Sequence, residues 1–370
     1  MPNPQSAPSS FVPPYPPSWL DHFTAWVDRL PGPAWVFYLV LGILAALVEA
    51  AIQWQEGAYP FGTFDAALVF TAVIFVYLLG LMHYLDKAAA SALEAFRPLL
   101  PPASLDGRLR TEDQSLYRRL SYELTTLPAR PALAATLLGV AFALGDFTLR
   151  IATGDDPPYL AGTARTALST ATFMPPFVAA NGIMVLLLYH TLHQLAQVSR
   201  VYTKYAAISI YRLKPLYALS LPGAYTAGGI IVFISTFLAT TTQSLQTAGL
   251  VALAISLTFA AIAGATFALP LAGAHRRLVK EKDSRLMDIS SRFEVTSARL
   301  HHQLDGNRLL QMDALNKALA SLEIEHAFVR RVPTWPWEPG TLRGLLAALL
   351  LPIAVWLIQL LLGRVFGALP

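Results

Sequence analysis

The chain has 370 residues, of which 55% are hydrophobic and 14% are charged, and this balance excludes an ordinary soluble domain. It indicates a protein that crosses a membrane several times. The formal net charge of +4 is interpreted as basic residues on cytoplasmic loops rather than as a surface for nucleic acid. Because the chain has no cysteine, disulfides, thiolate metal sites and cysteine nucleophiles are excluded.

The N-terminal part divides into two pieces. Residues 1–17 contain seven prolines, which disfavour both helix and sheet, so we expect a disordered tail. Residues 18–31 place aromatic and aliphatic side chains at helical spacing, which predicts a short amphipathic helix at the membrane interface. Ser18 and Asp21 have the spacing of a capping pair at its start.

Seven later segments are long and apolar enough to cross a bilayer, which requires roughly 20 residues. They are 34–54, 62–85, 130–151, 174–198, 220–241, 247–270 and 343–365. The predicted fold class is therefore an all-α integral membrane protein with seven transmembrane helices. Six of them form a bundle within 32–270, and 343–370 contains the seventh.

The positions of the basic residues predict the orientation of these spans. Lys and Arg number one in the N-terminal part, seven in 86–130, four in 199–218 and twelve in 271–343, which makes 24 of the 27. An N-terminus inside the cell places all 24 on the cytoplasmic side of the cell membrane and the C-terminus outside.

Two cytoplasmic segments are predicted to be helical. The first is the loop 86–130, in which an alanine-rich stretch at 86–97 favours a helix and three prolines then interrupt the chain. A leucine stripe after the prolines predicts a second, amphipathic helix beneath the bundle. The stripe consists of Leu116, Leu120, Leu124 and Leu127.

The other cytoplasmic segment, 271–342, lies between spans six and seven. Apolar residues recur there at three- and four-residue steps on both sides of a break at 305–307, which predicts a hairpin of two helices, each about 35 to 50 Å long. One alternative is a single long helix kinked at Gly306. The apolar stripe allows two partners, the other arm of the same subunit or a parallel coiled coil between subunits. Trp335 and Trp337, which follow the hairpin, are predicted to be anchors at the lipid headgroup level.

Two stretches near the C-terminal half, 211–220 and 333–337 with the span that follows, resemble a family of uncharacterised prokaryotic multi-pass membrane proteins. The arrangement of spans is also similar to that of the insect gustatory and odorant receptor type of ion channel. That resemblance implies a tetramer whose last span lines the pore. Of the sequence motif in the last span of that family, this chain has the glutamine, at Gln359. The pore or gate candidates are Gln359, Pro352 and Trp356.

Carboxylates near the outer ends of the spans predict an outer acidic mouth that would concentrate cations. Its members are Glu49, Asp65, Asp146, Asp155 and Asp156. The alternative is solvated helix ends, with Asp146 pairing with Arg150 four residues later.

His190 and His193 lie three residues apart near the inner end of span four. They are candidates for a pH-sensing pair, with interfacial packing as the alternative. A shared metal is disfavoured because no cysteine or suitably spaced carboxylate accompanies them, and we predict no metal site and no cofactor. The sequence contains no phosphate-binding loop, so we do not expect an enzyme.

The leading functional hypothesis is a homo-oligomeric, cation-leaning ion channel whose last helix lies near the pore axis and whose hairpin is an anchor. Opening by a ligand is one way in which such a channel would be gated. The alternative is a non-conducting membrane sensor or scaffold that signals through the hairpin to a cytoplasmic protein. Expected partners are the lipid bilayer and further copies of the chain, and nucleic acid is not expected.

Overall fold

The computed structural model describes residues 11–100, 109–153, 167–207, 209–240, 249–305, 312–351, 353–354, 357–358 and 361. Every regular element among them is a helix. Within these residues no strand occurs, apart from an isolated bridge between Pro17 and Pro128. The prediction of an all-α chain is confirmed.

The helices follow one another in four groups. The first is α1 (Trp19–Val27), α2 (Ala34–Gln55), α3 (Ala66–Phe96) and the 3-10 turn η1 (Arg97–Leu99). The second is α4 (Leu109–Thr125), α5 (Ala129–Thr153), α6 (Ala167–Arg200) and the π-helical turn η2 (Val201–Tyr205). The third is α7 (Leu213–Ala218), α8 (Leu221–Thr240), α10 (Gly249–Ala268) and the 3-10 turn η4 (Leu269–Leu271). The last is α11 (Ala272–Asp305), α12 (Met312–Arg331) and α13 (Pro339–Leu349).

Six helical segments in the described residues are long and apolar enough to cross a membrane. They are Ala34–Gln55, Ala66–Leu99, Ala129–Arg150, Phe173–Tyr205, Leu213–Thr240 and Leu257–Asp305. Each contains or overlaps one of the first six predicted spans. Helices suit the bilayer because they satisfy their own backbone hydrogen bonds. The predicted seventh span, 343–365, falls partly outside the described residues and stays a prediction.

α3 is the central helix of the bundle, since it packs against α2, α6 and α8. Its side chains Leu78, Met82 and Leu85 are fully buried. By contrast, α2 and α5 expose many large apolar side chains, among them Leu44 and Leu138. Such a surface suits contact with lipid.

The tightest helix contact lies between α5 and α6. A Cβ atom added at Gly139 would lie 2.3 Å from the backbone oxygen of Asn181 and 2.8 Å from Gly182 Cα. Only glycine allows the two backbones to approach this closely.

The alanine-rich stretch at 86–97 is helical as predicted, since α3 continues through it without a break to Phe96, with Ala89, Leu93 and Phe96 buried. One expectation about the N-terminal half is wrong. The disordered tail does not extend over residues 11–17. There the hydroxyl of Tyr15 donates to Thr126 O at 2.9 Å, and the hydroxyl of Tyr122 donates to Tyr15 O at 2.7 Å. Proline-rich chain cannot form a helix, but it can dock in an extended form.

The predicted cap of α1 and the amphipathic helix of the first loop are confirmed. Ser18 and Asp21 form a reciprocal capping box at the start of α1. α4 packs against α3 and α6, and its stripe residues Leu120 and Leu124, with Leu127 just beyond its end, are buried.

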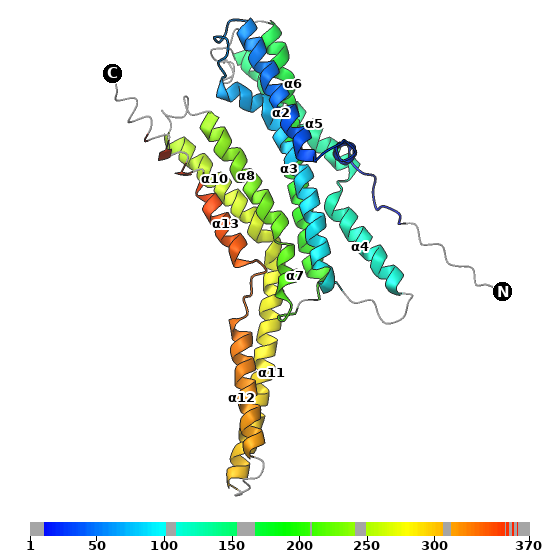
Figure 1. The fold of residues 1–370 in the computed structure, drawn as a ribbon, viewed down its shortest axis with the longest axis vertical. Coiled ribbons are helices and arrows are strands. Elements are labelled where there is room, and N and C mark those ends of the chain that lie inside the picture. Colours follow the sequence, from blue (N-terminus) through cyan, green and yellow to red (C-terminus); the bar gives the residue numbers. More distant parts are fainter. Residues whose placement is uncertain are drawn as a thin grey trace, which may run out of the picture.

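The two-helix hairpin is also present, and the single kinked helix is the wrong alternative. α11 leaves the bundle as the continuation of α10, and α12 runs back beside it (Figure 1). The 34 residues of α11 correspond to about 50 Å. Leu278, Ile289 and Val329 are buried between the bundle and the two arms, so these positions of the stripe face the other arm of the same chain.

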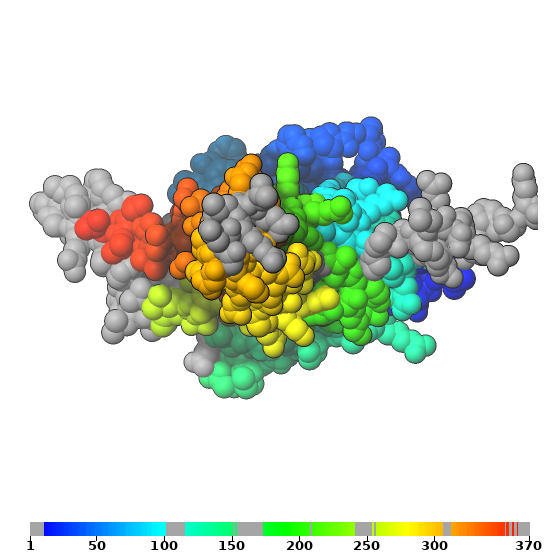
Figure 2. All heavy atoms as spheres, turned by 90° about the horizontal axis from the view of Figure 1, so that it is seen from below, coloured from blue at the N-terminus to red at the C-terminus, as the bar shows by residue number. Residues whose placement is uncertain are grey.

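α13 lies at one edge of the bundle, beside α8 and α10. Both views place α13 on the side away from α4 (Figures 1 and 2). One face of α13 packs through Leu345, while Leu346 and Leu350 are exposed.

Candidate functional site

The root of the hairpin is held by a stack of four aromatic rings. His275 of α11 stacks on Trp335 at a centroid distance of 4.0 Å, Trp335 on Trp337 at 4.4 Å, and Trp337 on Phe267 of α10 at 5.2 Å. His275 Nδ1 also donates to Thr334 O at 3.0 Å. The segment that leads into α13 is therefore fixed to the junction of α10 and α11.

Lys282 explains why a cation interrupts the apolar stripe of α11. Its Nζ donates to Arg330 O at 2.7 Å and to Val332 O at 2.8 Å, at the C-terminal end of α12. The last carbonyl groups of a helix have no partner within the helix and carry partial negative charge. Lys282 thus caps α12 and fixes it in register with α11.

A third contact joins the hairpin to α6. Arg277 Nη1 donates to Tyr202 O at 2.7 Å and to Thr203 O at 3.1 Å, both in the π-helical turn η2. Tyr202 is fully buried, and its hydroxyl donates to Leu216 O at 2.6 Å. We call the set Phe267, His275, Arg277, Lys282, Trp335 and Trp337 the hairpin joint, because it ties α6, α10, α11, α12 and the approach to α13 together.

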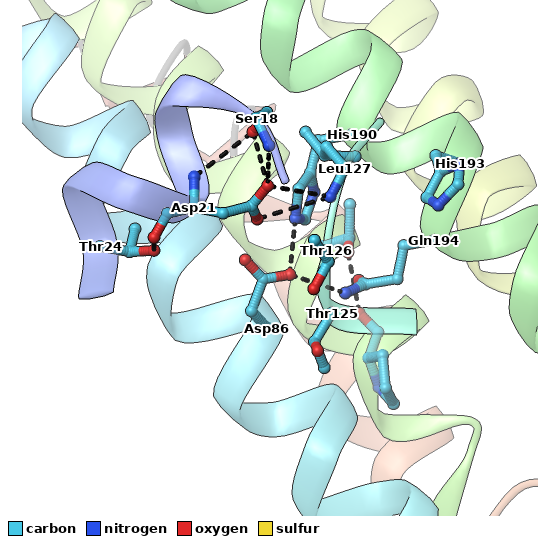
Figure 3. A network of polar contacts seen from close by, with 12 residues as sticks. Ser18, Asp21, Thr24, Asp86, Thr125, Thr126, Leu127, His190, His193 and Gln194 are labelled. Carbon is cyan, nitrogen blue, oxygen red and sulfur yellow. Dashed lines mark hydrogen bonds and ion pairs between the residues drawn. The ribbon is translucent and has the colours of Figure 1, made fainter. Parts of the chain in front are cut away.

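A buried polar network lies between α3 and α6 (Figure 3). His190 Nε2 donates to Asp86 Oδ1 at 2.9 Å, and Gln194 Nε2 lies 3.5 Å from the same oxygen. Nδ1 of His190 and Oε1 of Gln194 are both buried and make no hydrogen bond.

Glu123 of α4 extends this network. Its carboxylate accepts from Arg119 Nε and from Arg200 Nη1, each at 2.8 Å, and its backbone oxygen accepts from His193 Nε2 at 3.0 Å. The Glu123 side chain is buried, whereas the two arginines are partly exposed. Glu123 therefore clamps α4 onto α6 close to η2 and the hairpin joint.

Asp21 connects the N-terminal helix to the same region. Its carboxylate accepts from Ser18 N at 2.6 Å and from Leu127 N at 3.2 Å, at the start of the turn between α4 and α5 (Figure 3). Burial raises the pKa of Asp21, against the lowering effect of these hydrogen bonds. α1 is thereby fastened to the turn between α4 and α5.

A groove of about 760 Å³ runs between α2 and α3. Most of its lining is apolar, but Tyr38 and His83 line its polar end. There the Tyr38 hydroxyl donates to His83 Nδ1 at 3.0 Å. His83 Nε2 in turn donates to Asp28 Oδ2 at 3.2 Å. Lys87 Nζ lies 2.6 Å from Asp28 Oδ1. The groove has the size and character of a site for a largely apolar molecule.

The structure separates the members of the predicted acidic mouth. Glu49 and Asp65 line one small cavity. Asp146 pairs with Arg150 at 2.9 Å, as the alternative interpretation expected. Asp155 and Asp156 lie outside the described residues.

The remaining predicted residues fall into three cases. His190 and His193 bind different partners, Asp86 and Glu123, and the described residues contain no group of three His, Cys, Asp or Glu side chains placed to share a metal ion. The two tryptophans are in the hairpin joint, and their place at the headgroup level stays a prediction. The pore candidates Gln359, Pro352 and Trp356 lie outside the residues whose side chains are described.

Glu123 and Asp86 were missed in the sequence. Glu123 lies beside Leu120 and Leu124 on the apolar face of α4, and a carboxylate on the buried face of an amphipathic helix was the available signal. Asp86 could have been noticed as an acid inside a continuous helical pattern.

The hairpin joint and the polar network both consist of contacts between segments far apart in the sequence, by 59 residues for His275 and Thr334 and by 104 for Asp86 and His190. Such contacts need the whole fold. Their chemistry is the available guide to function, since comparison of the chain with protein-family models, curated proteins and solved structures gives no match.

Proposed function

We propose that this chain is the subunit of a homo-oligomeric, cation-leaning ion channel of the cell membrane. The segment that begins with α13 lies near the oligomer axis, and the hairpin joins neighbouring subunits on the cytoplasmic side. The N-terminus is inside, in accordance with the positive-inside rule.

The apolar surface of the hairpin carries this proposal. The hairpin projects beyond the apolar bundle and is rich in charged residues, so water rather than lipid surrounds it in this arrangement (Figure 1). Even so, Ile324 is 71% exposed, and five other large apolar side chains are exposed on the two arms. These are Met287, Phe293, Val295, Leu304 and Phe328. Exposed apolar side chains on an element that water surrounds can be covered by another protein, and a second copy is the occupant that we propose.

The edge position of α13 supports the same assembly. α13 packs on α8 and α10 and leaves Leu346 and Leu350 uncovered. A helix at the edge of its own subunit can meet its symmetry mates around an axis, as the pore helices of oligomeric channels do.

The hairpin joint supports a gate. Because Trp335 and Trp337 connect the start of α13 to α10 and α11, and Arg277 connects α11 to η2, a movement of α6 would be transmitted to α13. The apolar groove between α2 and α3 offers a place for the ligand that opens the channel.

Assembly can be tested by cysteine cross-linking, for which the absence of native cysteine gives a clean background. Single cysteines at Met287, Ile324 and Phe328 should be joined between chains by a short bismaleimide in native membranes. The matched control is Leu138→Cys, an exposed apolar position on α5. Cross-linking at Leu138 alone, or a monomer in nanodiscs by mass photometry, would contradict the proposed assembly.

Conduction needs a separate test in planar bilayers. We expect unitary currents with a reversal potential that follows the cation gradient, and block by a charged thiol reagent after Gln359→Cys but not after Leu138→Cys. An oligomer that cross-links through the hairpin but carries no current would favour the sensor or scaffold. That second function is supported by the contact of the hairpin with η2, which directly follows the helix that carries the polar network.

A further inference from the structure

The C-terminal end of α2 and the start of α3 enclose a small cavity at the end of the bundle opposite the hairpin (Figure 1). Its volume is about 10 Å³, which is room for a single particle the size of a water molecule. Five polar residues line it, together with Ala50, Leu68 and Val69. The polar ones are Glu49, Gln53, Tyr59, Thr63 and Asp65.

Glu49 and Gln53 are both only 4% exposed, which is unusual for a carboxylate and an amide. Gln53 Nε2 donates to Glu49 Oε1 at 3.1 Å. Since a carboxylate accepts hydrogen bonds and the amide nitrogen donates them, this contact fixes the orientation of the amide. Gln53 Oε1 is then left buried and without a hydrogen-bond partner in the wall of the cavity.

Asp65 holds its place through the start of α3. Its Oδ1 accepts from Ala67 N and Leu68 N, both at 2.9 Å, as the N-cap of the helix. Its Oδ2 accepts from the Tyr59 hydroxyl at 3.2 Å. The carboxylate is thus preorganised by the backbone of α3 and does not depend on a ligand for its position.

The site has negative charge and acceptor atoms without a matching cation. Neither Glu49 nor Asp65 forms a salt bridge with a basic residue of the described part of the chain. A buried carboxylate beside an amide oxygen that lacks a donor is unfavourable unless a positive charge joins them.

We propose that this cavity binds one Ca²⁺ ion, through the carboxylates of Glu49 and Asp65 and the amide oxygen of Gln53. Oxygen atoms alone favour a hard cation, and the polar side chains of the lining supply no nitrogen or sulfur donor of the kind that Zn²⁺ prefers. Two carboxylates match a divalent charge. Mg²⁺ retains several of its waters and requires a larger space, whereas Ca²⁺ accepts irregular sets of carboxylate and carbonyl oxygens.

The bound ion fastens the end of α2 to the start of α3 across the connection 56–65. Because this inference uses neither the hairpin nor a pore, it stands or fails independently of the proposed channel.

Thermal unfolding of the full chain in nanodiscs, after treatment with a chelator, provides the first test. Addition of CaCl₂ should raise the Tm by several degrees in a saturable way, and equal concentrations of MgCl₂ or NaCl should not. Glu49→Gln and Gln53→Leu should each remove the Ca²⁺-dependent rise. Asp313→Asn, which changes an exposed carboxylate of α12, should retain it.

Luminescence of bound Tb³⁺ provides a second test that does not depend on a variant that may be unstable. Tyr59 lines the cavity, so its excitation should sensitise Tb³⁺ in the wild-type protein, and Ca²⁺ should displace the signal. No displaceable luminescence, an equal effect of Mg²⁺, or a Tm rise that persists in Glu49→Gln would each overturn the proposal. A Tm that responds only to pH would assign the cavity to a protonated Glu49 and would overturn it too.

Discussion

His275 and Trp335 lie face to face, with ring centroids 4.0 Å apart and an interplanar angle of 9°. His275 also binds Thr334, the residue before Trp335, which lies 59 positions later in the chain. The whole hairpin lies between them in the chain. The stack therefore closes the base of the hairpin and fixes the direction in which the chain enters α13.

The stack predicts a specific loss of stability. Trp335→Ala removes two ring contacts, each worth about 0.5–1.5 kcal/mol beyond the burial of apolar area, and should lower the free energy of unfolding accordingly. Trp335→Phe keeps a ring and should lose less. Unfolding in mixed detergent micelles with increasing SDS measures both. Equal stability of wild type and Trp335→Ala would show that the stack does not hold the hairpin.

Lys282 predicts a difference between two neighbouring lysines. Lys282→Met removes two charge-assisted hydrogen bonds, each worth about 1.5–3 kcal/mol, and leaves the end of α12 uncapped. Lys280→Met, at an exposed position of the same helix, is the matched control and should change little. Limited proteolysis after Arg330 and Arg331 should accelerate only in the Lys282 variant. Similar cleavage of both variants would contradict the capping role.

The contact between α5 and α6 predicts opposite effects for two glycines of one helix. Gly139→Ala places a methyl group against the backbone of Asn181 and should destabilise the protein by about 1–3 kcal/mol. An alanine at Gly145 meets no atom within 4 Å and should leave stability unchanged or slightly higher. SDS titration of both variants measures the two changes in the free energy of unfolding. Equal changes would mean that α5 and α6 do not approach as closely as described.

The ion pair at the polar end of the α2–α3 groove predicts a dependence on pH. Burial raises the pKa of Asp28, but the hydrogen bond from Lys87 and the contact with His83 outweigh it, so that the pKa lies below the ordinary value of 3.8. The unfolded chain then binds more protons in this range, so the stabilisation is complete above pH 3.8 and is lost as the pH falls through the folded pKa.

Because the Asp28 side chain is 45% exposed, solvent screening limits this contribution to less than about 1 kcal/mol. The difference in Tm between wild type and Asp28→Asn should be positive near pH 7 and should shrink below pH 3.8. A difference that is constant over this range would show that charge is not its origin. Asp313→Asn, in an exposed pair on α12, is the control.

The sequence alone determined the helical class, the positions of six apolar helices and the two-arm hairpin. These features depend on local periodicity and on the length of apolar runs, which each segment carries by itself. The N-cap by Ser18 and Asp21 was predictable for the same reason, because it involves residues three positions apart.

Only the tertiary structure decided how these segments meet. In the sequence Lys282 interrupts an apolar stripe, and only the structure shows that it binds the C-terminal end of α12. Asp86 and His190 come into contact only because α3 and α6 pack against each other. Residues 11–17 dock on α4 because the Tyr122 hydroxyl donates to Tyr15 O, although more than a hundred positions separate the two residues. Contacts of this range depend on the packing of several helices at once, which no local pattern in the sequence encodes.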